Sequence, residues 1–292
     1  MTLAPFDFHQ PPTLEGVIEA LGQYGSEASL LAGGTALLID LQQGGLNPRH
    51  VVSLWGVKQL GELRLNGAFH IGSLATMTDL AKSIRPADHA LAGLREAALQ
   101  VGSRQIQNMA TVGGNLCKAS PGADLVPPLL CLDAVLSLSG RQGERILPLD
   151  GFLTGPDQTA LFPAEVLSAV RLPPTPPHSG TAFLKIMRRR AVDCSIVSVA
   201  ARVTLADDLQ TCTQIRIGVA AAAPNPFRAR RAEASLEGGP LDAKLAAEAG
   251  RLAQEDSHPI DDIRASAGYR RILVETLVAR ALLVAKQRAE AA

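Results

Sequence analysis

A proline-rich segment, PPTPP at residues 173–177, constrains the fold of this chain more than any other feature of the sequence. Proline lacks a backbone N–H and has a fixed φ, so such a segment cannot lie inside a helix or a central strand. The segment therefore separates a larger N-terminal region from a smaller C-terminal one. A chain of 292 residues is long enough for about two domains.

The N-terminal region is predicted to begin with a small βαβ unit. The segment TLEGVIEALGQYG predicts a helix capped by Thr13, and residues 29–32 predict a short apolar strand. A tight glycine turn follows, Thr35 opens a helix with the sequence ALLIDLQQ, and HVVSL is the next strand. This order of elements is typical of a parallel strand pair with a helical connection.

The rest of the N-terminal region is predicted to be α+β. In ELRLNGAFHIGS, Asn66-Gly67 separates two alternating runs, which is the strongest short-range indication of a hairpin. One helix is expected to be capped by Thr78, and a second to begin after Pro86. Strands are predicted in LLCLDAVLSLSG, ERILPL and EVLSAVRL.

The C-terminal region is predicted to be a second, smaller α+β unit. TAFLKIM, CSIVSVAARVTL and CTQIRIGVAAA are expected to form three strands of a sheet. From Arg228 onwards, apolar spacing and alanine content predict helices. Together these elements make a small sheet with a helical layer.

Composition excludes several classes of function. The 28 basic and 28 acidic side chains cancel, so no nucleic-acid partner is expected, and aromatic residues at 3% do not favour base stacking. No run of about 18 apolar residues predicts a membrane span, and the first residues lack the pattern of a secretory leader, so a cytoplasmic location is expected. The four cysteines have no C-x-x-C spacing and the six histidines stand alone. No metal ligand is therefore assigned.

Two segments each place a Gly-Gly pair after a run of apolar or small residues: LLAGGTALL at 30–38 and NMATVGGNL at 108–116. Glycine permits φ > 0 and lets the backbone approach a ligand closely. After the first pair a helix is expected, whose unpaired N–H groups favour a phosphate. After the second pair no comparable helix is expected, because LCKASPGAD resembles a turn. Its amides would instead form an anion-binding nest with Thr111 and Asn115 as further donors.

These patterns alone leave two interpretations open. Both glycine pairs are compatible with ordinary tight turns, since glycine is a common turn residue. Both are also compatible with a nucleotide or phosphate site. Neither completes a G-x-G-x-x-G fingerprint, and the chain has no P-loop, so a Rossmann or P-loop site is not predicted.

LLAGGTALL together with MATVGGNLCKASPGADLVPPLL resembles the flavin-binding (medium) subunit of the molybdenum hydroxylases, a family of the carbon monoxide dehydrogenase and xanthine dehydrogenase type. PFDFHQPPTLEGVIEAL and LKIMRRRAVDCSIVSVAARV are similar to the family's opening and to the start of its C-terminal domain. The resemblance implies an α+β fold with an FAD-binding domain of the VAO/PCMH type at 1–175, in subdomains of about 1–57 and 58–175. A smaller C-terminal α+β domain, with a three-stranded antiparallel sheet and helices, would follow at 178–292.

The resemblance also implies which residues bind FAD, in an extended conformation between the two N-terminal subdomains. They are Leu31, Ala32, Gly33, Gly34, Thr35, Ala36, Leu37 and Leu38 in the first segment, Thr111, Val112, Gly113, Gly114 and Asn115 in the second, and Asp124, Leu167 and Lys185 elsewhere. Each of the last three has a simpler alternative. Asp124 could cap a turn, Leu167 could belong to a strand core, and Lys185 could be solvated. Cys194 stands where many relatives have an aromatic residue, which would leave one flavin face more open.

The implied function is electron transfer. A family member of this kind accepts electrons from the [2Fe–2S] clusters of a small subunit, beside a large molybdopterin subunit, and passes them to NAD, a quinone or oxygen. No catalytic residue of its own is expected. Two alternatives are a stand-alone VAO-like flavin oxidase and a non-catalytic assembly subunit that has lost FAD. The intact glycine pairs argue against the latter, and the lack of an evident acid–base cluster argues against the former.

Overall fold

A computed structural model describes residues 4–66, 68–189 and 192–292. The chain begins with a three-stranded parallel sheet in the order β1-β3-β2, formed by β1 (Asp7–His9), β2 (Ala28–Leu31) and β3 (His50–Ser53). Helix α1 (Leu14–Tyr24) is capped by Thr13, as predicted, and α2 (Leu37–Gln42) connects β2 to β3. The predicted βαβ unit is thus present. Strand β1, which was not predicted, extends it to three strands.

A second, antiparallel sheet has the order β4-β5-β10-β6-β7. Its strands are β4 (Leu63–Asn66), β5 (Ala68–Gly72), β6 (Val135–Gly140), β7 (Gly143–Pro148) and β10 (Val166–Leu172). The predicted hairpin is formed by β4 and β5, although Gly67 lies outside the described residues. A small ribbon, β8 (Leu153–Gly155) with β9 (Gln158–Thr159), precedes β10. Because β10 enters the centre of this sheet, Leu167 is held in a buried strand.

Short helices lie between this sheet and the C-terminal region: α3 (Met77–Ser83), α4 (Ala92–Leu99), α5 (Arg104–Gln107), α6 (Val112–Cys117) and α7 (Val126–Cys131). Thr76, and not Thr78, caps α3, because Thr76 is extended and forms a capping box with Asp79. The predicted strand at LLC is also wrong. These residues end α7, whose first turn holds Pro127 and Pro128, where a missing N–H costs nothing.

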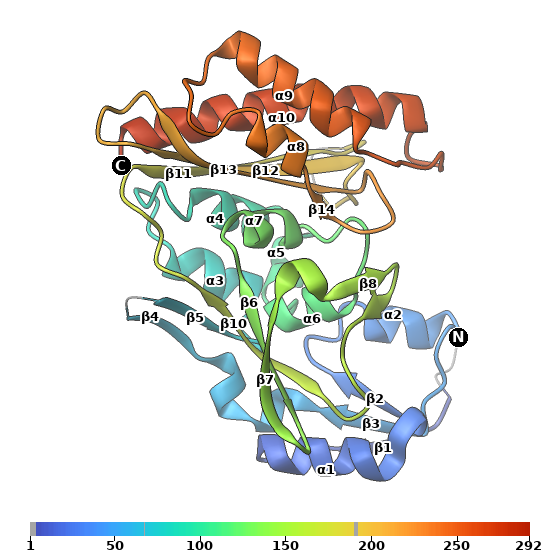
Figure 1. Ribbon diagram of the computed structural model, residues 1–292. Coiled ribbons are helices and arrows are strands. Elements are labelled where there is room, and N and C mark those ends of the chain that lie inside the picture. The colour runs from blue at the N-terminus through green and yellow to red at the C-terminus, as the bar shows by residue number, and fades with distance from the viewer. Residues whose placement is uncertain (1–3, 67, 190–191) are drawn as a thin grey trace.

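The C-terminal region is a sheet with helices on its outer face (Figure 1). Strands β11 (Ser179–Ile186), β12 (Val197–Leu205) and β13 (Cys212–Ala220) are the three that were predicted, and the two-residue β14 (Phe227–Arg228) adds a fourth antiparallel strand. Helices α8 (Arg230–Ala234), α9 (Ala243–Glu255) and α10 (Ala267–Glu290) follow. Within the described ranges, no helix is long and apolar enough to cross a bilayer.

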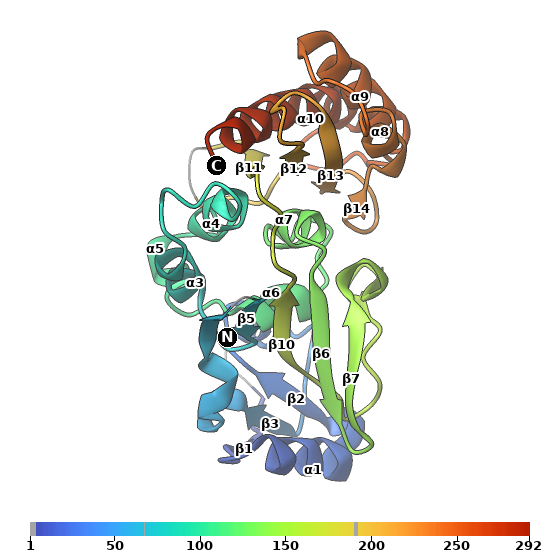
Figure 2. The same ribbon diagram turned by 60° about the vertical axis from the view of Figure 1, so that its left-hand side comes forward.

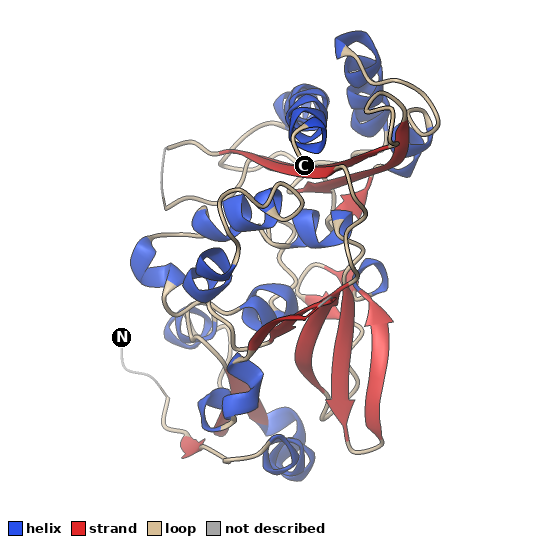
Figure 3. Cartoon of the chain, turned by 90° about the vertical axis from the view of Figure 1, so that its left-hand side faces the viewer, coloured by secondary structure: helices blue, strands red, loops and turns tan. Residues whose placement is uncertain are grey.

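The inner face of the C-terminal sheet packs directly on α4 and α7, which Figures 2 and 3 show as a helical layer between the sheets. The packing is close: a β-carbon on Gly218 would stand 2.5 Å from the Pro127 oxygen. Asp133, just after α7, pairs with Arg202, Arg216 and Arg228 of the sheet. These contacts hold the C-terminal sheet against the N-terminal region.

Candidate cofactor site

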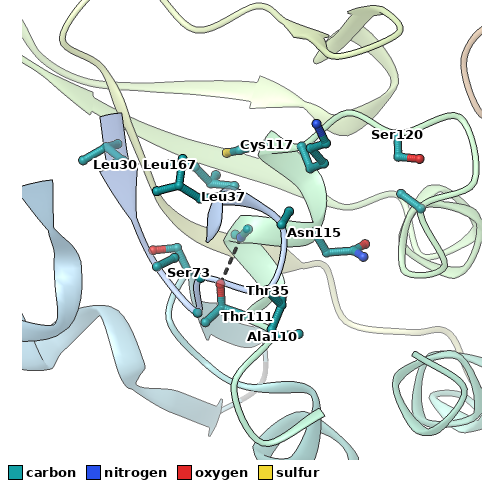
Figure 4. Close-up of a pocket in the computed structure, with 18 of the residues that line it drawn as sticks. Leu30, Thr35, Leu37, Ser73, Ala110, Thr111, Asn115, Cys117, Ser120 and Leu167 are labelled. Carbon is teal, nitrogen blue, oxygen red and sulfur yellow. Dashed lines mark hydrogen bonds between the residues drawn. The ribbon is translucent and has the colours of Figure 1, made fainter. Parts of the chain in front are cut away.

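A cavity of about 720 Å³ lies between the N-terminal parallel sheet, helix α6 and strand β10. Its volume falls within the usual range for small-molecule and cofactor sites. Figure 4 shows side chains from the first segment, from α6 and from β10 gathered around it. Of the predicted site residues, it is lined by Ala32, Gly33, Gly34, Thr35, Ala36, Leu37, Thr111, Gly113, Gly114, Asn115, Asp124 and Leu167.

The first glycine loop, residues 33–37, presents a run of free backbone amides. In the part of the chain that the structure describes, none of the amide N–H groups of these residues donates to a protein acceptor. Gly34 adopts φ +73°, a conformation that glycine reaches without strain. The helix after the loop, α2, begins at Leu37, with Ala36 in the cap position and without a side-chain cap. The expectation that Thr35 opens this helix is therefore wrong, and the loop is left as a nest of free donors.

The second glycine loop, residues 111–115, is not a nest. Contrary to the sequence-based expectation, it forms the first turn of α6, capped by the Thr111 hydroxyl, which accepts from the Gly114 N–H at 3.0 Å. The N–H groups of Val112 and Gly113 donate to the carbonyl oxygens of Ala75 and Ser73 at 2.9 and 2.8 Å. Tertiary hydrogen bonds thus stabilise a helix start that two glycines would otherwise disfavour.

The second loop therefore contributes a part of the cavity wall that has no side chains at Gly113 and Gly114. A β-carbon on Gly113 would stand 2.7 Å from the Ser73 β-carbon, and one on Gly114 would stand 2.9 Å from Thr111 Oγ1. The glycines allow α6 to pack closely on its neighbours, and Asn115 remains at the cavity surface as a polar side chain. Its Oδ1 accepts from the Leu125 N–H at 3.4 Å, which leaves the amide Nδ2 to donate.

Asp124 lies in the cavity wall, and behind it is a buried ion pair with Lys185. Lys185 Nζ is 2.7 Å from Asp124 Oδ2, and the Ser195 hydroxyl donates to Asp124 Oδ1 at 2.9 Å. The Lys185 side chain is only 1% exposed and also donates to the Gln100 carbonyl at 3.2 Å. Burial raises the pKa of Asp124 above its ordinary value, although the charge and hydrogen bond of Lys185 and the hydrogen bond of Ser195 oppose the shift. Asp124 thus joins the cavity to the C-terminal region.

Some predicted site residues do not line the cavity: Leu31, Leu38, Val112 and Lys185. Leu31 ends strand β2, Leu38 is 44% exposed on α2, and Val112 is packed in the core. Lys185 reaches the site only through Asp124. Cys194 is exposed and is also absent from the lining, so its expected effect on the flavin face stays a prediction.

Sequence reasoning missed several residues that do line the cavity, among them Asp40, Ser73, Lys118 and Asp157. Ser73 directly follows β5, next to the glycine wall of α6. Lys118 is placed by the end of α6, a helix that was not predicted. Nothing in the sequence around these residues distinguishes them from other surface serines, lysines and aspartates.

The fold and this cavity define a two-part α+β protein with a cofactor-sized cavity beside a loop of free backbone amides. A family model described as the FAD binding domain in molybdopterin dehydrogenase matches residues 4–175, and one described as the CO dehydrogenase flavoprotein C-terminal domain matches residues 182–285. The chain belongs to this family of FAD-binding subunits of molybdopterin-dependent dehydrogenases. The family, the oxidoreductase class and the FAD cofactor expected from the sequence are thereby confirmed.

Individual relatives agree along almost the whole chain. The xanthine dehydrogenase FAD-binding subunit of Escherichia coli O157:H7 is 34% identical over 283 residues, covering 95% of this chain and 96% of the relative. The carbon monoxide dehydrogenase medium chain of Afipia carboxidovorans is 30% identical, with 98% of both chains covered. A chain of carbon monoxide dehydrogenase from Hydrogenophaga pseudoflava superimposes with a TM-score of 0.93 at 30% identity, over 99% of both chains. The α+β fold class, with its two-part order, is confirmed.

The residues of the cavity fit FAD. A diphosphate requires several hydrogen-bond donors, and the free amides of residues 33–37 would supply them without any basic side chain. The adjoining wall carries no side chain at Gly113 and Gly114, so these two positions take up little room in the cavity. Leu167 and Asp124 add one apolar and one polar side chain to the lining of the cavity.

Proposed function

We propose that this chain holds FAD in the cavity described above and is the electron-transfer subunit of a heterotrimeric molybdenum hydroxylase. It would receive electrons from the [2Fe–2S] clusters of a small subunit, beside a large molybdopterin subunit, and deliver them to NAD, a quinone or oxygen. The support comes from relatives that are named as medium chains and FAD-binding subunits of such enzymes. Bound FAD supplies the redox chemistry, since it exchanges electrons both singly and in pairs.

In this proposal each wall of the cavity has a distinct task. The amides of residues 33–37 bind the diphosphate, and the glycines of α6 leave room for it. Asn115 and Asp124 offer a donor and an acceptor to polar groups of the cofactor, while Leu167 contacts its apolar part. Leu31, Leu38 and Val112 support these residues from behind. Lys185 acts on the cofactor through Asp124.

The run of free amides at residues 33–37, which line the same cavity as Gly113 and Gly114 of α6, is the observation that carries the proposal. An assembly subunit that had lost FAD would leave this run of donors without a ligand. We also retain the expected division into 1–175, with subdomains of about 1–57 and 58–175, and 178–292. The four free thiols support a reducing compartment such as the cytoplasm.

A stand-alone oxidase would need its own acid–base group beside the flavin. Among the described residues, the titratable side chains of the cavity are occupied. Asp40 and Asp157 pair with Lys118, and Asp124 pairs with Lys185. Burial raises the pKa of the Cys117 thiol to about 12, so it stays protonated and unreactive near neutral pH.

The proposal is tested by isolating the full-length chain with the subunits that accompany it from its host. We expect about one FAD per chain, together with molybdenum and iron in partner subunits, and no substrate oxidation by the separated chain. A chain isolated without flavin, and unable to take up added FAD, would contradict the proposal. Substrate turnover by the chain alone would favour the oxidase alternative.

A further inference from the structure

Three charged side chains from three separate segments meet at the rim of the cavity. Lys118, which follows α6, lies 3.2 Å from Asp40 of α2 and 3.3 Å from Asp157 in the turn between β8 and β9. All three line the cavity, and their side chains are between 29% and 65% exposed. The ammonium of Lys118 therefore bridges two elements that approach the cavity from different parts of the chain.

Helix α2 is loosely attached to the rest of the molecule. Of its six residues only Leu41 is buried, while Leu38 and Ile39 are 44% and 49% exposed. Asp40 is the one charged residue of this helix, so its pair with Lys118 is the ionic contact that α2 makes within the described ranges. The free-amide loop at 33–37 leads directly into α2. Whatever fixes α2 therefore also fixes the orientation of these amides.

Lys118 also offsets the negative charges of Asp40 and Asp157 at the rim of the cavity. Without it, the carboxylates of Asp40 and Asp157 would face an anionic cofactor and oppose its binding. Burial acts to lower the pKa of Lys118, but the hydrogen bonds and charges of the two carboxylates outweigh this effect and hold the pKa above its ordinary value. Lys118 therefore remains charged at neutral pH, where the two carboxylates are also ionised.

We propose that Lys118 is a positioning residue, which bridges Asp40 and Asp157 and so holds α2, and with it the free-amide loop, over the diphosphate of FAD. This inference rests on the proposed function. Lys118 slows release of the cofactor by keeping the loop in place, while the loop amides make the contacts to phosphate. We call these two ion pairs, Asp40–Lys118 and Lys118–Asp157, the strap, because they connect α2 to the end of α6 at the cavity rim.

A direct contact between Lys118 and phosphate makes the opposite prediction for Asp40. If Lys118 held the phosphate itself, Asp40→Asn would free its ammonium and remove a repelling charge, so FAD would bind more tightly. If Lys118 acts as a strap, Asp40→Asn breaks the attachment of α2 and FAD leaves faster. Whether Asp40→Asn slows or speeds the release of FAD therefore distinguishes the two roles of Lys118.

The experiment measures the rate of FAD release by the recovery of flavin fluorescence, using the full chain in the assembly in which it is isolated. Lys118→Gln and Asp40→Asn should each raise the rate about two- to fivefold, the range expected for a partly exposed ion pair. Lys118→Arg should restore most of the retention, and the differences should shrink as salt increases. Lys286→Gln is the matched control, because Lys286 pairs with Glu290 at 3.6 Å on α10 and should leave release unchanged.

A second readout needs no cofactor. In the FAD-free chain, the amides of α2 should exchange hydrogen faster in Lys118→Gln and Asp40→Asn than in the unaltered chain. Slower FAD release from Asp40→Asn, or unchanged exchange in α2 for both variants, would overturn the inference. Failure of the unaltered chain to bind FAD at all would instead contradict the proposed function, while the exchange measurement would still test the strap.

Discussion

Gly33 lies directly against the backbone carbonyl of Met109: a β-carbon at Gly33 would stand 1.8 Å from that oxygen. Met109 leads into the second glycine loop, so this contact joins the two loops into one wall. Gly33 is not among the glycines with positive φ. Position 33 therefore requires glycine because a side chain would not fit there. Without a side chain, the backbones of the two loops can touch.

Gly33→Ala should separate the loops and weaken FAD binding. Overpacking against backbone costs about 1–3 kcal/mol, so we expect FAD affinity to fall about tenfold or more. Gly61→Ala is the control, since Gly61 has open space around its α-carbon. Flavin titration with circular dichroism on the same samples checks this expectation. Unaltered affinity in a folded Gly33→Ala chain would refute the role of the contact.

Gly34 and Gly44 form a matched pair for testing the nest. Their φ angles are +73° and +75°, so the backbone strain of an alanine should be similar at both positions, about 1 kcal/mol, with a further tight contact to Leu38 and Leu31 at position 34 only. Only Gly34 belongs to the free-amide loop. We predict that Gly34→Ala weakens FAD binding severalfold, whereas Gly44→Ala lowers the melting temperature alone. Equal affinities in the two variants would show that the loop conformation does not matter.

The sequence identified both glycine loops and the family, because these depend on local motifs. It did not predict helix α6, since Val112-Gly113-Gly114 has low helix propensity and the helix depends on hydrogen bonds to Ser73 and Ala75 far along the chain. The place of Lys185 behind Asp124 depends on how the C-terminal sheet packs against α4 and α7. The strap at Lys118 depends in turn on α6. The positions of residues that depend on tertiary contacts could thus not be predicted from the sequence.

Lys185→Met should be strongly destabilising, because it leaves the buried carboxylate of Asp124 without its charge partner. We expect a loss of about 3–5 kcal/mol in the free energy of unfolding. The double variant Lys185→Met/Asp124→Asn should recover much of this loss. Urea unfolding of FAD-free protein separates the effect from cofactor binding. A double variant as unstable as the single one would indicate that Lys185 acts by packing only.

Glu165 should make stability depend on acid pH. Its hydrogen bonds with Arg145, at 2.7 Å, are the main cause of a pKa below the ordinary value of 4.5. A lowered folded-state pKa stabilises the protein above the unfolded pKa, and this contribution disappears as pH falls through the folded value. Glu165→Gln should therefore be less stable than the unaltered chain at pH 7, by about 1 kcal/mol. The difference should narrow below about pH 4.5, and a gap in unfolding free energy that stays constant with pH would refute this assignment.

The central claim is that backbone amides of residues 33–37 bind the FAD diphosphate, while those of residues 112–115 are already engaged within the protein. Hydrogen exchange of the full-length chain with and without FAD tests it most directly. FAD should slow exchange at residues 33–37 markedly and leave the already protected amides of α6 nearly unchanged. Equal exchange at residues 33–37 in the two states, or new protection confined to α6, would contradict the claim.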